Sequence, residues 1–333
     1  MKKIQIVSII AIVLIISGTF WVMSSRTVNH QSDVISRAAP EVGPRAHILL
    51  PNLKNAHLVV PDRPHDPSEV FREDKAEKIT RVREFYASTN TMGFRSPELA
   101  EPKSKPRILC IGDSVTFGWG VDDSETYPAL LQKRLPNTEV INVGVPALKP
   151  EHVLRYVNIF IDTVQPDLVL LAMRPNWMTP NALQSYTQTI KQLQNKVKPA
   201  KLGVILPPIA SFDPKGRAQE KQEVSAIRRS LNKLPLLDLT PIFDQNMPKT
   251  GVKLVQEGNL QKMVSRIDGT VVAQGNNPLP PQALAEEIIQ QFEQDSDIKE
   301  PLFFDGGHPD AEGFILFADA LASWLQEEAL VTN

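Results

Sequence analysis

The sequence predicts an α/β protein built on a doubly wound parallel sheet. From Arg107 onward, short apolar runs alternate with amphipathic stretches, as expected for strands joined by crossover helices. The run Asp167–Met173 is almost continuously apolar, which is typical of a strand buried on both faces. We therefore predict one three-layer α/β/α domain over residues 105–330.

The expected elements follow one another with short connections. The strands are Arg107–Ile111, Glu139–Val143, Asp167–Met173, Leu202–Leu206 and Leu234–Leu237. The helices are Glu125–Leu135, His152–Val164, Pro180–Lys196, Arg217–Lys233 and Gly313–Leu325.

One stretch, about Phe243–Glu300, breaks this alternation and is interpreted as an insertion. Strands are expected at Val252–Gln256, Leu260–Ile267 and Thr270–Gln274, separated by hairpin turn signals, and a helix at Gln282–Gln294. This β-hairpin or meander plus helix is either a lid or substrate wall, or a structural flap without substrate contact.

The N-terminus carries a membrane signal. Lys2 and Lys3 precede an uncharged apolar run, and a spanning helix needs about 20 such residues, against about 7–15 for a signal-peptide core. We predict a signal-anchor helix over residues 1–25, with the body outside the cytoplasm by the positive-inside rule. A cleaved signal peptide, giving a secreted protein, is the alternative, although Val22–Ser24 is only a weak cleavage site.

Residues 26–104 are rich in proline and charge, and they predict a membrane-proximal linker with a small strand-containing module. Net charge is −2, from 36 basic and 38 acidic residues, so no nucleic-acid partner is indicated. Cys110, the only cysteine, excludes an intramolecular disulfide and is interpreted as a core residue. The sequence holds no phosphate loop, metal-ligand cluster or dinucleotide motif, so we expect no cofactor. It does not indicate the oligomeric state.

A serine follows the first strand of the predicted sheet. Gly112, Asp113 and Ser114 come directly after Arg107–Ile111, and ligands of open α/β sheets bind beyond the carboxyl ends of strands. A serine hydroxyl needs an adjacent base to act as a nucleophile. Asp113 is assigned a turn-forming role.

His308 is the candidate base. Asp305 lies three residues earlier on a Gly-Gly loop, so its carboxylate can orient one imidazole nitrogen while the other faces Ser114. A capped helix start at Asp310 is the alternative interpretation of this loop. His152, at a predicted helix start, is expected at the surface or as a cap.

These two motifs resemble the first and last blocks of the SGNH/GDSL hydrolases, over about Arg107 to Gln326 without the insertion. The resemblance implies a flavodoxin-like fold and a Ser114–His308–Asp305 triad. It also implies an oxyanion hole formed by Ser114, Gly144 and Asn176. Arg174 and Trp177 depart from the family's Gly-x-Asn-Asp block, which suggests altered walls of the site.

Trp119 and Trp177 are candidate substrate contacts. The segment Thr89–Arg95 resembles a stretch that precedes the hydrolase domain in some membrane-anchored members of this family, but no chemistry follows from it.

Three functions remain open on the sequence. The first is an extracytoplasmic serine esterase acting on an acyl ester of a glycan, a lipid or a small molecule, with an O-acetylated polysaccharide as first choice. The second is an O-acyltransferase in polysaccharide or envelope assembly that uses the same site. The third is a catalytically silent binding or assembly module, which the altered block at Arg174–Trp177 favours.

Overall fold

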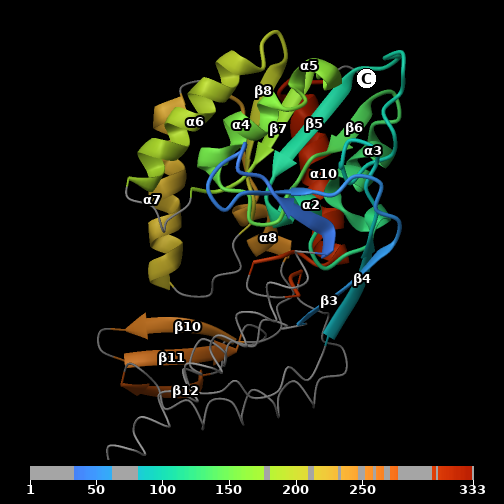
Figure 1. Ribbon diagram of the computed structural model, residues 1–333. Coiled ribbons are helices and arrows are strands. Elements are labelled where there is room, and N and C mark those ends of the chain that lie inside the picture. Colours follow the sequence, from blue (N-terminus) through green and yellow to red (C-terminus); the bar gives the residue numbers. More distant parts are fainter. Residues whose placement is uncertain are drawn as a thin grey trace, which may run out of the picture.

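The structure, a computed structural model, describes ten segments of the chain (Figure 1). These are residues 34–61, 82–175, 181–208, 214–231, 234–246, 252–257, 260–265, 271–276, 302–304 and 307–331. The predicted signal-anchor helix over residues 1–25 and the predicted helix Gln282–Gln294 lie outside them. Within these ten segments, no helix combines the length and the apolar character needed to cross a bilayer.

Five parallel strands form the central sheet. They are β5 (Arg107–Gly112), β6 (Glu139–Asn142), β7 (Leu168–Ala172), β8 (Lys201–Leu206) and β9 (Leu236–Asp238). They lie in the order β6-β5-β7-β8-β9, and each neighbouring pair is parallel. The prediction of a parallel sheet is therefore confirmed, and the order is the flavodoxin-like one, in which the first strand lies between the second and the third.

Helices cover both faces of this sheet (Figure 1). One layer holds α4 (Val153–Asn158), α5 (Ile161–Val164), α6 (Ala182–Lys196) and α7 (Pro214–Leu231), and the other holds α3 (Tyr127–Arg134) and α10 (Ala311–Glu327). Successive side chains of β5 point to opposite faces of the sheet, so this strand packs against both helix layers. Leu109 and Ile111 pack in the first core, while Ile108 and Cys110 pack in the second.

The helix predicted over His152–Val164 is broken into three pieces. A 3₁₀ turn, η3 (Pro150–His152), leads into α4, and the chain leaves helical geometry at Phe160 before α5 begins. Phe160 is buried, and its ring packs edge-on against Phe94 and Tyr156. Packing of this aromatic side chain therefore accompanies the break.

The region before the sheet contains two antiparallel pairs. Strand β1 (Ser36–Ala38) pairs with β2 (His47–Leu49), and β3 (Ala56–Pro61) pairs with β4 (Val82–Ala87). Side chains of this region belong to the same buried cluster as one face of the sheet; they include Ile35, Leu49, Leu58, Phe85 and Phe94. The region thus shares its core with the sheet, which it contacts directly.

Three further strands follow α8 (Thr240–Asn246). They are β10 (Val252–Glu257), β11 (Leu260–Ser265) and β12 (Val271–Asn276), and they form an antiparallel sheet in that order. The predicted meander is confirmed, whereas its role as lid or flap stays a prediction.

Candidate active site

Ser114 begins a short helix at the carboxyl end of β5. Helix α2 (Ser114–Phe117) has Asp113 as its N-cap, whose carboxylate accepts from the Val115 amide at 3.0 Å. Gly118 ends the helix in the left-handed region at φ 88°, which a residue without a Cβ adopts at low cost. The helix is only four residues long, so its position depends on what surrounds it.

His308 lies on a narrow loop that returns to the same edge of the sheet. The Phe304 amide donates to the His308 carbonyl at 3.2 Å, and the Asp310 amide donates to Leu302 at 3.0 Å. Asp310 also caps α10 by accepting from the Gly313 amide at 2.8 Å. Hence the capped helix start expected as an alternative is present, and the same cap fixes the loop that carries the imidazole.

The two catalytic candidates meet across 194 positions of sequence. The Ser114 hydroxyl and the His308 Nε2 lie 2.7 Å apart, within hydrogen-bond distance. Asp305, the predicted third member, lies outside the described residues. The structure thus brings together the nucleophile and base that the sequence predicts, and the triad as a whole stays a prediction.

Asp113 occupies the turn role assigned to it, next to the nucleophile. Burial raises the pKa of this carboxyl above its ordinary value, against the lowering effects of the Val115 amide and of the charge on His308. The contacts of Asp113 make it part of the α2 cap.

The predicted oxyanion donors are only partly described. Asn176 and Trp177 lie outside the described residues. The Gly144 amide donates to the Asn142 side chain at 2.9 Å, so this amide already has a protein acceptor. A Cβ at Gly144 would lie 2.2 Å from the Phe117 nitrogen, which means that the absent side chain lets the loop after β6 touch α2. The Ser114 amide is at the first position of a helix, where amides lack intrahelical acceptors.

Arg174 connects neighbouring elements, and the suggestion of altered walls around the site stays a prediction. Its side chain is 14% exposed and turns toward the ends of neighbouring elements. Nε donates to the Pro207 carbonyl at 2.6 Å, and Nη2 donates to Glu220 at 2.9 Å and Thr240 at 2.7 Å. The arginine therefore links the chain after β7 to β8, α7 and α8.

Two other predicted residues have packing roles. Trp119 lies against the rings of Phe85 and Phe117, with centroids at 5.6 and 6.1 Å, and its role as a substrate contact stays a prediction. The expectation that His152 lies at the surface was wrong, because the residue is 6% exposed. It does occupy the N-cap position of α4, but its side chain makes no capping hydrogen bond. A Cβ at Gly43 would lie 2.5 Å from its ring, so the early chain covers it.

Sequence reasoning missed Asn142 and Arg95. Asn142 is buried and links β6 to the Gly144 amide, and its Nδ2 donates to the Phe117 carbonyl at 3.4 Å. Its position two residues before Gly144, near the end of the predicted strand Glu139–Val143, was the available signal. Arg95 lies in the Thr89–Arg95 segment, from which no chemistry was expected.

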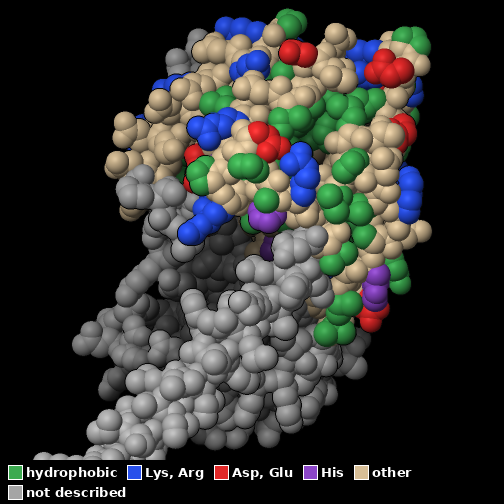
Figure 2. All heavy atoms as spheres, viewed as in Figure 1, with side chains coloured by type: hydrophobic (Ala, Val, Ile, Leu, Met, Phe, Trp, Pro, Cys, Tyr) green, Lys and Arg blue, Asp and Glu red, His purple; other side chains and the backbone are tan. Residues whose placement is uncertain are grey.

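Charges are mixed on the face shown in Figure 2. Basic and acidic side chains alternate with hydrophobic ones over the described part of that face. In the part of the chain that the structure describes, no group of three His, Cys, Asp or Glu side chains is arranged to hold a metal ion.

Comparison with known proteins gives a similarity of fold. No family model matches the chain, and no curated protein matches its sequence. Solved structures with a similar fold include a lipolytic G-D-S-L family protein from Veillonella parvula, with 13% identity and a TM-score of 0.41 over 65% of this chain and 96% of that one. A lipase/acylhydrolase from Enterococcus faecalis has 16% identity and a TM-score of 0.41, over 67% and 96% of the two chains. A variant of the Geobacillus acetyl-xylooligosaccharide esterase Axe2 has 19% identity and a TM-score of 0.40, over 69% and 98%.

The fold and the site together define a parallel α/β protein with a serine–histidine pair at the carboxyl edge of its sheet. The identities and TM-scores are low, and the geometry of that pair is the feature that bears on function.

Proposed function

We propose that this protein is a serine esterase that hydrolyses an acyl ester. The observation that carries the proposal is the 2.7 Å separation between the Ser114 hydroxyl and the His308 Nε2 at the carboxyl edge of a parallel sheet. A serine is activated for attack on a carbonyl when an imidazole can take its proton.

In the proposed reaction, Ser114 Oγ bonds to the ester carbonyl carbon as His308 Nε2 takes the hydroxyl proton. The bond from the carbonyl carbon to the alcohol oxygen then breaks, and the alcohol leaves with the proton from His308. Water next gives a proton to His308 and attacks the acyl group. The Ser114 oxygen leaves, regains the proton, and the free acid departs.

Three further residues are assigned within this proposal. Asp305 would accept from the second imidazole nitrogen and hold its tautomer. The Ser114 amide and the Asn176 side chain would donate to the oxyanion. The Gly144 amide donates to the Asn142 side chain, so it would serve as an oxyanion donor only by giving up that bond.

We also propose that the domain works outside the cytoplasm, behind an N-terminal anchor. The support is the apolar run after Lys2 and Lys3. Fusing a reporter enzyme that is active only outside the cytoplasm after residue 333 tests this placement. An inactive but folded reporter would overturn it.

Labelling with a fluorophosphonate tests the site in the full-length chain, kept in a non-ionic detergent. We expect one phosphonyl group on Ser114, located by peptide mass spectrometry, and hydrolysis of a short-chain aryl ester. Ser114→Ala should lose both, while Ser124→Ala, an exposed serine ten residues away, should keep both. A folded wild-type chain that neither labels nor hydrolyses would contradict the proposal.

The same preparation distinguishes hydrolysis from acyl transfer. An O-acetylated oligosaccharide incubated with the protein should release free acetate. A gain of acyl groups on an unacylated glycan, in the presence of an acyl donor, would instead assign the site to transfer.

A further inference from the structure

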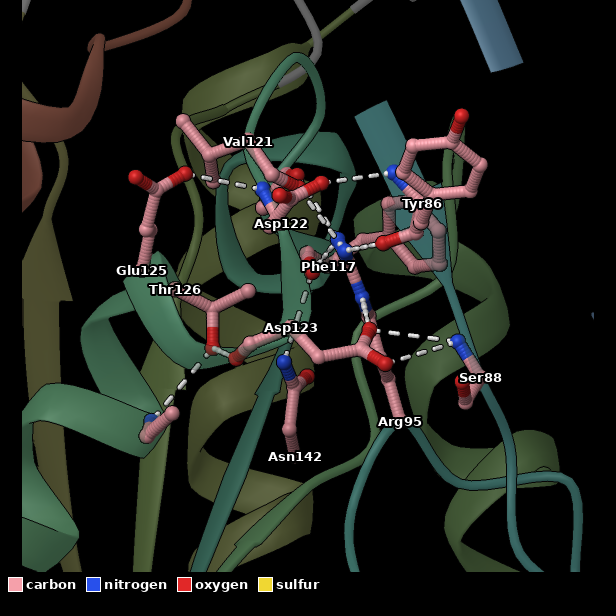
Figure 3. A network of polar contacts seen from close by, with 12 residues as sticks. Tyr86, Ser88, Arg95, Phe117, Val121, Asp122, Asp123, Glu125, Thr126 and Asn142 are labelled. Atoms are coloured by element: carbon pink, nitrogen blue, oxygen red, sulfur yellow. Dashed lines mark hydrogen bonds and ion pairs between the residues drawn. The ribbon is translucent and has the colours of Figure 1, made fainter. Parts of the chain in front are cut away.

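Arg95 lies against the end of α2, the short helix that begins with Ser114. The Arg95 side chain has no exposed surface, and Figure 3 shows it at the centre of a polar network. Its Nε donates to the Asp123 carboxylate at 2.7 Å. Its two terminal nitrogens donate to four backbone carbonyls, those of Tyr86 (2.9 Å), Phe117 (3.0 Å), Gly118 (2.8 Å) and Val121 (2.8 Å). All five donors of the guanidinium are therefore engaged.

Two of those carbonyls belong to the end of α2. Phe117 and Gly118 are three and four residues after Ser114, and the last carbonyls of a helix have no partner within it. Arg95 donates to both carbonyls, and its guanidinium carbon also lies 4.5 Å from the centroid of the Phe117 ring. Since α2 has one turn, fixing its end fixes the backbone that carries the nucleophile.

The loop that presents Arg95 is itself held in place. The Asn90 side chain accepts from the amides of Met92 and Phe94 at 2.9 and 3.0 Å and donates to the Pro97 carbonyl at 3.0 Å. Gly93 lies at φ 79°, where a side chain would be strained. The Thr89–Arg95 segment is thus a hydrogen-bonded turn that places the Arg95 guanidinium against the end of α2.

Asp123 closes the network from the other side. Its carboxylate accepts from Arg95 and from the Ser88 amide at 3.0 Å, so it joins the residue that follows β4 to the chain that follows α2. A planar guanidinium matches this set of acceptors, whereas an ammonium has only three donors.

We infer that Arg95 is a positioning residue for Ser114: it holds α2 so that the hydroxyl stays within reach of His308. The inference rests on the proposed function. It also gives the segment before the sheet a part in catalysis, since the arginine, its loop and the Tyr86 carbonyl all come from residues 82–95.

A purely structural role is the competing explanation, and the chain offers a matched control. Arg107 is 1% exposed and donates to Glu139, Val164 and Ala100 in the same manner, but it starts β5 at the end of the sheet away from Ser114. Replacing either arginine by lysine removes a buried guanidinium from the same fold. Only the loss of Arg95 should disturb the nucleophile.

The experiment compares Arg95→Lys and Arg107→Lys in the full-length chain, at a temperature well below both unfolding transitions. We expect the Arg95 variant to be phosphonylated on Ser114 about 10- to 100-fold more slowly, because small displacements of a reacting group cost about that much. Its kcat on an aryl ester should fall equally, with KM changed less than about twofold. The Arg107 variant should keep both rates within about threefold, despite a similar loss of Tm.

Equal rates in the two folded variants would overturn the inference while leaving the esterase proposal intact. A wild-type chain that never labels would instead refute the esterase proposal.

Asp123→Asn gives a second test, which stands even if Arg95→Lys does not fold. Asp123 is 42% exposed, and its control is Asp319→Asn, which removes a 58% exposed partner of Arg134. We expect a threefold to tenfold slower labelling only in the Asp123 variant, about half the logarithmic loss expected for Arg95. Equal labelling in these two variants would also overturn the inference.

Discussion

The ring of Phe304 stacks on the imidazole of His308, with centroids 5.7 Å apart and planes inclined by 20°. The guanidinium carbon of Arg83, on β4, lies 5.0 Å from the centroid of the same phenylalanine ring. A Cβ at Gly120 would fall 2.2 Å from that ring, so the chain after α2 packs closely against it. The base is therefore buttressed by an aromatic side chain that two other segments hold.

Phe304→Leu should lower turnover about threefold to tenfold, because an aromatic contact of this kind contributes about 0.5–1.5 kcal/mol beyond its buried area. Steady-state kinetics on an aryl ester measures this. Phe303→Leu is the matched control: Phe303 is equally buried but faces Phe243 in the other core. Similar losses of turnover in both variants would contradict a specific role for Phe304.

Gly144→Ala should abolish most activity. Its new methyl group would lie 2.2 Å from the Phe117 nitrogen, and backbone cannot yield as a flexible side chain does. Either α2 or the loop after β6 must move, and we expect a loss of about 100-fold or more in kcat/KM. Gly307→Ala, where an added Cβ meets nothing within 4 Å, should keep the wild-type Tm. Full activity in the Gly144 variant would show that this contact is dispensable.

Asp113→Asn should stabilise the protein at neutral pH. Burial raises the pKa of Asp113 above its ordinary 3.8. A carboxyl whose pKa is raised in the folded protein stabilises the fold at pH values below its pKa in the unfolded chain. That contribution is lost as the pH rises through its pKa in the folded protein. Asparagine keeps an oxygen for the Val115 amide without the charge. We expect Tm to rise by a few degrees at pH 7 and by less at pH 3. An equal shift at both pH values would contradict this account.

Cys110 should resist alkylation in the native protein. It is fully buried, and burial raises the pKa of its thiol to about 12. At pH 8 the reactive thiolate is then about one part in ten thousand of the total. Iodoacetamide at pH 8 should leave mass and esterase activity unchanged, while the same reagent in guanidinium chloride should add one group. Rapid native modification would show that the second core opens locally.

The strands of the sheet could be predicted because each is a short, strongly apolar run that can be recognised without knowledge of its partners. All five predicted strands overlap observed ones, and β5 begins at Arg107 as expected. The break at Phe160 escaped prediction, because it accompanies contacts of that ring with Phe94, which is distant in sequence.

The residues of the candidate site that belong to short sequence motifs could be predicted. Those whose roles depend on tertiary contacts could not. Ser114 and His308 each follow a recognisable turn, and few histidines compete for the role of base. Arg95 gives no such signal, since its role depends on acceptors that lie 9 to 28 positions away in the sequence. The Gly144 amide was expected to face a substrate, and only the conformation of Asn142 shows that it has another partner.

Arg174 occupies a position at which the SGNH/GDSL resemblance leads one to expect glycine. Unlike a glycine, it makes side-chain hydrogen bonds to other elements. Glu220 also accepts from the Thr240 hydroxyl at 2.5 Å. The Arg174 guanidinium therefore donates to two side chains that are hydrogen-bonded to each other. Replacing Arg174 by glycine would remove the cation that lies beside the buried Glu220 carboxylate. We therefore expect these three positions to have been inherited as a set, and homologues that keep the arginine should keep the acid and the hydroxyl with it.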